Sequence, residues 1–217
     1  ASPYFVGKLA DQLATRLPPG IVQDARVGAR RQVPVDELRA IGRVWDTLPS
    51  EDDDLESMPD ESAERALRDL EARLAGTEPR SVLLVGESGT GKTALIRQTA
   101  RRLQRAGWVV FEASGADLIA GQSFVGQLEG RMRALIEALA GRDVLWVVPS
   151  FHELAYAGAT LQDPSTVLDM ILPWLDRGSL RVIGETRPQQ LERLLVRSPR
   201  LRTALSIVHL DPLGDED

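Results

Sequence analysis

The sequence of 217 residues contains no cysteine, only two lysines and no long apolar run. Without cysteine it has no disulfide framework and no thiolate metal site, which suits a cytoplasmic protein. No segment approaches the roughly 20 apolar residues that a membrane-spanning helix needs, and residues 1–12 lack the pattern of a signal peptide. We therefore expect a cytoplasmic protein without a membrane partner.

Positive charge is scarce as well. With 32 acidic against 26 basic residues the formal net charge is −6, so the composition does not indicate a nucleic-acid partner. The two lysines are Lys8 and Lys92, against 24 arginines. Lys92 lies within GESGTGKT, where a compact ammonium group rather than a planar guanidinium is needed.

An acidic, turn-rich stretch divides the chain. Residues 1–50 carry two helical patterns, of which Pro34 opens the second, with apolar positions at Leu38, Ile41, Trp45 and Leu48. Residues 51–62 are expected to form an acidic linker, and residues 63–217 the main domain. Because the chain begins without methionine and stops just after its last expected strand, we expect a piece of a longer protein.

From residue 81 onward, apolar segments alternate regularly with amphipathic ones. The expected strands are residues 81–86, 108–113, 144–148, 180–186 and 206–210. The expected helices are residues 93–107, 131–142, 166–178 and 188–196. This alternation predicts an α/β fold in which helices sandwich a five-stranded parallel sheet.

The motif G-x-x-x-x-G-K-[ST] follows the first of these strands and opens a helix. Its residues are Gly86, Glu87, Ser88, Gly89, Thr90, Gly91, Lys92 and Thr93. The glycines let backbone N–H groups surround phosphate oxygens, and the helix N-terminus adds partial positive charge. We expect Lys92 to reach the β- and γ-phosphates, and the Thr93 hydroxyl to coordinate Mg²⁺. The motif thus predicts that ATP or ADP binds together with Mg²⁺.

The segment AGQSFVGQLEGRMR, residues 120–133, resembles the pore loop in the first ATPase module of the Clp/Hsp100 AAA+ unfoldases. Gly121 and Gly126 flank the aromatic Phe124, although basic neighbours usual in the family are replaced by Ser123 and Val125. The resemblance implies that Phe124 projects into a ring channel and grips a polypeptide client. The alternative is that Phe124 belongs to the core.

A second segment, ILPWLDRGSLRVIGETR, residues 171–187, also resembles the Clp/Hsp100 pattern. The matching positions are Pro173, Leu175, Arg177, Gly178, Leu180, Gly184 and Thr186. The resemblance covers roughly residues 63–213 and implies a P-loop NTPase of the AAA+ large-subdomain type, working in a homo- or hetero-oligomeric ring. It places Thr186 at the sensor-1 position, facing the γ-phosphate and its attacking water. The helical lid expected after the fifth strand is absent from the sequence.

The family's third strand ends in Asp-Glu, which hold the Mg²⁺ shell and activate water. Here Val148 and Pro149 occupy those positions, and residues 144–152 contain no carboxylate. The acids that could substitute are Glu153, Glu112 and Glu185.

A second loss affects the arginine fingers, which in the family lie in Leu-Glu-Arg-Arg-Phe. The equivalent run is residues 201–205, where Thr203 and Ala204 take the finger positions. Arg200 and Arg202 are the nearest arginines and could approximate one finger, but they are at the wrong positions along the chain. We therefore expect an ATP-binding module, poor in hydrolysis, that acts as a nucleotide-dependent assembly or protein-remodelling component. An active unfoldase or disaggregase subunit with a relocated acid, and a P-loop kinase, remain as alternatives.

Overall fold

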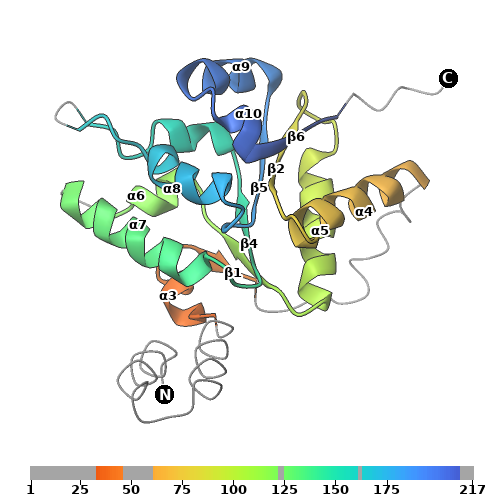
Figure 1. The fold of residues 1–217 in the computed structure, drawn as a ribbon, viewed down its shortest axis with the longest axis horizontal. Coiled ribbons are helices and arrows are strands. Elements are labelled where there is room, and N and C mark those ends of the chain that lie inside the picture. The colour runs from red at the N-terminus through yellow and green to blue at the C-terminus, as the bar shows by residue number, and fades with distance from the viewer. Residues whose placement is uncertain (1–32, 46–60, 122–124, 161–162, 211–217) are drawn as a thin grey trace, which may run out of the picture.

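A computed structural model describes residues 33–45, 61–121, 125–160 and 163–210. A six-stranded sheet of order β1-β3-β4-β5-β2-β6 forms its centre (Figure 1). The strands are β1 (Arg43–Val44), β2 (Ser81–Val85), β3 (Val109–Glu112), β4 (Val144–Val148), β5 (Val182–Thr186) and β6 (Leu205–His209). All neighbouring strands are parallel except β1 and β3. The predicted α/β fold is confirmed, with one antiparallel strand added to the five parallel ones.

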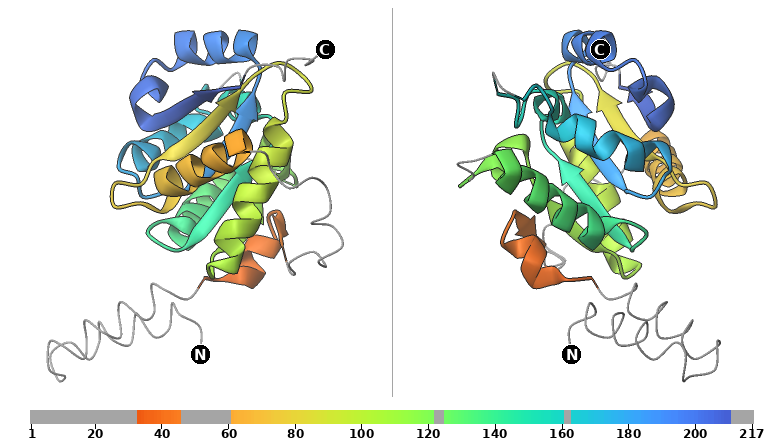
Figure 2. Two further views of the ribbon diagram at one scale, coloured as in Figure 1. Left: turned by 90° about the vertical axis from the view of Figure 1, so that its right-hand side faces the viewer. Right: turned by 60° about the vertical axis from the view of Figure 1, so that its left-hand side comes forward.

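Helices cover both faces of the sheet (Figures 1 and 2). They are α3 (Val35–Arg39), α4 (Glu61–Ala75), α5 (Lys92–Arg105), α6 (Gly115–Ile119), α7 (Val125–Leu139), α8 (Val167–Asp176), α9 (Pro188–Arg197), α10 (Leu201–Ala204) and the 3₁₀ helix η2 (Phe151–Ala155). Helices α4 and α5 pack on one face, and α7 and α8 on the other. Among the described residues, no helix is long and apolar enough to cross a membrane.

The central strands are apolar on both sides because both sides are covered, so β2 and β4 are buried throughout. Side chains alternate between two core clusters along β4. Leu145 and Val147 pack with the α4 and α5 cluster, whereas Trp146 and Val148 pack with the α7 and α8 cluster. Alternation along a strand therefore decides whether the side chain of its last residue points toward α4 and α5 or toward α7 and α8.

The helix predicted from Pro34 through Leu48 is wrong between Ala40 and Trp45, because α3 ends at Arg39, and Leu48 lies outside the described residues. The chain then runs beside β3 as β1, pairing Arg43 with Glu112. Gly42 permits this approach, because a Cβ there would lie 2.5 Å from the carbonyl oxygen of Glu112. The indole Nε1 of Trp45 donates to Glu112 Oε2 at 2.8 Å. Backbone pairing with the sheet edge thus overrides the helical pattern, and most of the acidic linker lies outside the described residues.

The helix predicted from residue 131 begins earlier, at Val125. Gly126 consequently lies within α7 and not in a loop as the resemblance suggested. Gly121 has a left-handed backbone with φ of +72°. Phe124 lies outside the described residues, so its predicted role as a pore-loop aromatic stays a prediction.

Candidate functional site

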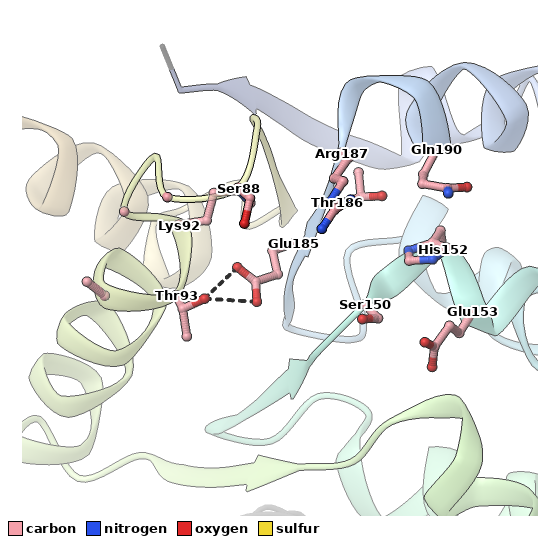
Figure 3. A pocket seen from close by; sticks show the side chains of 13 residues that line it. Ser88, Lys92, Thr93, Ser150, His152, Glu153, Glu185, Thr186, Arg187 and Gln190 are labelled. Carbon is pink, nitrogen blue, oxygen red and sulfur yellow. Dashed lines mark hydrogen bonds between the residues drawn. The ribbon is translucent and has the colours of Figure 1, made fainter. Parts of the chain in front are cut away.

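A cavity of about 670 Å³ opens at the carboxyl ends of β2, β4 and β5 (Figure 3). Its walls come from the loop between β2 and α5, the first turn of α5, the start of η2 and the end of β5. In open sheets with parallel strands, ligands bind at this edge because loops and helix N-termini converge there. The volume is in the range of small-molecule and cofactor sites.

The loop between β2 and α5 depends on its glycines. Gly89 and Gly91 have φ of +88° and +79°, a region that other L-residues rarely adopt. Gly91 is the N-cap of α5. A Cβ on Gly86 would lie 2.6 Å from Thr90 Oγ1. Such a backbone can turn N–H groups toward an anion at the N-terminus of α5, as the motif predicts.

Lys92 lies in the first turn of α5 and is only 9% exposed. Its Nζ donates to the carbonyl oxygen of Glu87 at 2.6 Å and to Thr90 Oγ1 at 3.3 Å. Both acceptors are neutral, and charge-assisted bonds to phosphate are roughly twice as strong as neutral ones. The ammonium group therefore lies where a phosphate oxygen would be a better partner than those it has.

Thr93 and Glu185 face each other across the cavity (Figure 3). The Thr93 hydroxyl lies 3.0 and 2.9 Å from Glu185 Oε1 and Oε2. A hydroxyl and a carboxylate are hard oxygen donors of the kind that Mg²⁺ binds, so these residues fit that ion. The described residues contain no group of three or more metal-ligating side chains, so Mg²⁺ would need phosphate oxygens and water as further ligands.

Thr186, the predicted sensor, also lines the cavity. It is 3% exposed, and its Oγ1 has no hydrogen-bond partner. A buried hydroxyl without a partner costs about 1–3 kcal/mol. This orphaned atom is consistent with a polar ligand in the cavity, although its role as a sensor stays a prediction.

The helix η2 brings a carboxylate to the cavity. Ser150 has φ of +50°, and the chain turns there from β4 into η2. Glu153 and His152 then line the cavity. The chain after β4 thus folds back toward the cavity, as a substitute acid on this segment requires. Among the three substitute acids, Glu153 and Glu185 line the cavity, whereas Glu112 bonds Trp45.

The structure corrects the position of the missing acids. Val148 is fully buried in the cluster on the opposite face from α5, so the expectation that it occupies the metal-organising position is wrong. By strand alternation Pro149 is the next residue on the α5 side. Ser150 lines the cavity. The two positions that directly follow β4 and replace the missing acids are thus Pro149 and Ser150, and neither carries a charge.

The predicted finger positions differ in exposure. Thr203 is exposed, and its hydroxyl donates to the Arg200 carbonyl oxygen at 2.9 Å. Ala204 is 2% exposed and lies in the core, so a charged side chain there would not reach a neighbouring molecule. Arg200 is paired with Asp176. Of the two predicted positions, only Thr203 lies on the surface.

Sequence reasoning missed Arg187 and Gln190, which line the cavity beside Thr186. Pro188 begins α9 immediately after β5, and this brings the first turn of α9 to the cavity rim. Proline at the first helical position was the available signal. The short helix α6 was also missed, although Ser114 and Asp117 form a capping box at its start.

The AAA ATPase domain family matches residues 61–209 of this chain. Among curated proteins, the chaperone protein ClpB of Corynebacterium efficiens is 29% identical over 145 residues, which is 62% of this chain and 17% of ClpB. The chaperone protein ClpB 2 of Parasynechococcus marenigrum is 32% identical over 145 residues, 62% of this chain and 16% of its own. The matched region thus spans about a sixth of these relatives.

Solved structures show the same fold. The extended conformation of an S. cerevisiae Hsp104:casein complex aligns over 80% of this chain and 30% of its own, with a TM-score of 0.62 and 20% identity. An S. cerevisiae Hsp104–ADP complex aligns over 70% of this chain and 22% of its own, with a TM-score of 0.55 and 23% identity.

Proposed function

The chain belongs to the AAA ATPase domain family as a Clp/Hsp100-type module, and on that premise we propose that it binds ATP and hydrolyses it slowly. In this role nucleotide binding, more than turnover, controls assembly with other subunits or the remodelling of a polypeptide. Mg²⁺, when bound with the nucleotide, neutralises phosphate charge. The chain's own residues bind and orient the phosphates.

The observation that carries nucleotide binding is the loop at the N-terminus of α5. Gly89 and Gly91 hold a left-handed backbone, while Lys92 and Thr93 present a cation and a hydroxyl to one cavity. The same cavity contains the unpartnered hydroxyl of Thr186. An anion would satisfy groups that the protein alone leaves without strong partners.

Slow hydrolysis is supported by what β4 presents to the cavity. Neither Pro149 nor Ser150 can accept a proton from water or bind a cation through a carboxylate. A general base contributes roughly 10²–10⁴-fold to a rate. The surface position that the family pattern assigns to an arginine finger is Thr203, which removes a second contribution.

A polypeptide partner is supported by the pore-loop pattern around Phe124 and by relatives named as chaperones. One similar structure is described as a complex with casein. We propose that this chain likewise contacts an unfolded segment or a partner subunit, with Phe124 as the contact, inside a ring formed with further copies or related subunits.

The test combines affinity with turnover in the same preparation. Calorimetry should detect ATP and ADP binding, and single-turnover cleavage of bound ATP should be far slower than in an active ClpB assayed alongside. Failure to bind either nucleotide would exclude the proposed function. Cleavage as fast as in the active relative would exclude the slow-hydrolysis part alone.

The alternative, an active ATPase with a relocated acid, has one observation in its favour. Glu153 is exposed and lines the cavity from η2, where a carboxylate could orient water. In that case Glu153→Gln would lower the cleavage rate by about 10²–10⁴-fold with little change in ATP affinity. In the function that we propose, the already slow rate should change little.

A further inference from the structure

We propose that Glu185 on β5 is the carboxylate that organises the nucleotide-bound Mg²⁺ in this protein, in place of an acid on β4. The inference rests on the proposed nucleotide binding and adds a residue to it. It is carried by the contact between Glu185 and Thr93 and by the position of Glu185 within the sheet.

The strand order explains why β5 can take this role. β5 lies between β2, which leads into the phosphate loop, and β4. In the register of β2 and β5, Leu84 is opposite Glu185 and Val85 is opposite Thr186. A residue at the end of β5 therefore starts one strand closer to the phosphate loop than any residue of β4.

Side-chain alternation along β5 sends its last two residues in different directions. Ile183 packs in the α4 and α5 cluster, so Glu185, two residues on, points to the same side as α5. Thr186 points to the other side, together with Val182. Glu185 and Thr186 can thus serve different parts of one ligand, with Glu185 directed at Thr93.

The two side chains are as close as neighbouring ligands of one Mg²⁺, which lie about 3 Å apart in an octahedral shell. The Thr93 hydroxyl lies nearly equidistant from both oxygens of Glu185, at 3.0 and 2.9 Å. A hydroxyl has one proton and can donate to only one of them at a time. A divalent cation between these groups would instead use the lone pairs of both residues, with phosphate oxygens and water completing its shell.

The negative charge of Glu185 should change ATP affinity in opposite directions with and without Mg²⁺, and both changes can be measured. Without a cation, a carboxylate beside the phosphate loop repels the nucleotide, so it opposes ATP binding. With Mg²⁺ the same carboxylate attracts the ion and favours the complex. Glu185→Gln should therefore have opposite effects on ATP affinity in EDTA and in Mg²⁺, whereas simple damage to the loop would weaken binding in both.

The test measures ATP affinity by calorimetry in EDTA and in Mg²⁺, and Mn²⁺ binding to the ATP complex by electron paramagnetic resonance. Wild type should bind ATP more tightly in Mg²⁺, and Glu185→Gln should lose this increment, with cation affinity falling about 10–100-fold. In EDTA, Glu185→Gln should bind ATP at least as well as wild type. Thr93→Ala should remove the same increment, and combining it with Glu185→Gln should cause no further loss. Thr93→Ser keeps the hydroxyl and should keep the increment.

Two charge-matched variants serve as controls. Glu192→Gln removes an exposed carboxylate on α9 outside the cavity and should keep the full increment. Glu153→Gln removes the other carboxylate that lines the cavity and should also keep it. A full increment in Glu185→Gln, or its loss in Glu153→Gln alone, overturns the proposal. ATP binding by wild type without any Mg²⁺ effect overturns the metal site and leaves the proposed function intact, whereas no ATP binding overturns both.

Discussion

Phe151 packs directly on Gly184. A Cβ added to Gly184 would lie 2.9 Å from Cδ2 and 3.0 Å from Cβ of Phe151, so there is no room for a larger residue. Phe151 is fully buried and is the first residue of η2. The contact therefore fixes η2 on the end of β5. Because Ser150, His152 and Glu153 line the cavity next to it, this packing also sets how those side chains approach the ligand.

Gly184→Ala should destabilise the protein by about 1–3 kcal/mol, since the added methyl group overpacks a closed contact. ATP affinity should fall as well, because η2 must shift. Urea unfolding and calorimetry measure the two effects. Gly130→Ala is the matched control, because a Cβ there meets nothing within 4 Å. It should stabilise α7 by about 0.5–1 kcal/mol. If both variants changed the free energy of unfolding in the same direction and by the same amount, the packing argument would be wrong.

Lys92→Ala should weaken ATP binding by about 10–100-fold, corresponding to a charge-assisted bond of about 1.5–3 kcal/mol. Calorimetry measures the affinity, and a thermal melt checks that the loop, where Lys92 also bonds Glu87, survives. Arg97→Ala removes a cation from the exposed side of the same helix and should leave the affinity unchanged. Wild-type affinity in Lys92→Ala would show that the ammonium group does not touch phosphate.

Restoring acids at Pro149→Asp and Ser150→Glu should raise single-turnover ATP cleavage, by less than the roughly 10²–10⁴-fold of a complete general base. The gain stays small because Thr203 supplies no finger and because the left-handed backbone of residue 150 has not been adapted to hold a longer side chain against water.

Val148→Asp serves as the comparison. Its carboxylate would enter the core on the far face, so it should cost about 3–5 kcal/mol of stability without raising cleavage. Urea unfolding and rapid-quench cleavage assays distinguish the two variants. A gain in cleavage from Val148→Asp would mean that β4 presents the other face to the nucleotide.

Phe124→Ala should change stability by less than about 0.5 kcal/mol, as expected for an exposed position. Binding to an unfolded polypeptide such as casein should weaken about tenfold or more, as at an aromatic contact. Ile119→Ala removes an exposed apolar side chain on α6 and should affect neither property. A stability loss of about 3–5 kcal/mol would instead show that Phe124 is a core residue.

The pair between Glu64 of α4 and Arg102 of α5 predicts a pH dependence. The hydrogen bond from Arg102 holds the pKa of Glu64 below its usual value of 4.5, and Arg68 lowers it further. Because the folded-state pKa is depressed, this stabilisation is present above pH 4.5 and is lost as the pH falls through the folded-state value.

Glu64→Gln should therefore lower the urea midpoint at pH 7 and flatten the acid side of the stability curve. Arg102→Met should have the same effect, and the double variant should lose less than the sum of the two. An unchanged acid limb in Glu64→Gln would show that other carboxylates control this range.

The phosphate loop and the parallel strands could be predicted because each is encoded locally. The glycine pattern specifies its own backbone, and continuous apolar runs such as residues 144–148 indicate strands buried on both faces. The face to which a strand-end residue points was harder. The sequence pattern assigned Val148 to the metal-organising position, whereas its side chain points into the core on the opposite face. Finding this requires the positions of the neighbouring strands and helices, which a comparison of strand ends does not give.

The partners of the substitute acids were also beyond the sequence. Along the chain Glu153 is the acid nearest to the missing pair, ahead of Glu112 and Glu185. Only the sheet order brings Glu185 to Thr93 and Glu112 to Trp45. The strand β1 was missed for a related reason. The apolar residues around it, Leu38, Ile41 and Trp45, follow a helical period, whereas its pairing comes from a backbone approach that Gly42 allows.

The two residues of β1 also cover one edge of the sheet. They pair with β3 at the sheet edge, while the carbonyl oxygen of Trp45 accepts from Gln104 of α5 and its backbone N–H donates to Val110. A shortened protein beginning at residue 61 would keep every residue that lines the cavity but would expose the backbone N–H and C=O groups of β3. An open, apolar strand of that kind pairs readily with the same strand of another molecule. Residues 33–45 therefore cover the edge of β3, and we expect a protein that begins at residue 61 to aggregate through that edge while its nucleotide affinity is retained.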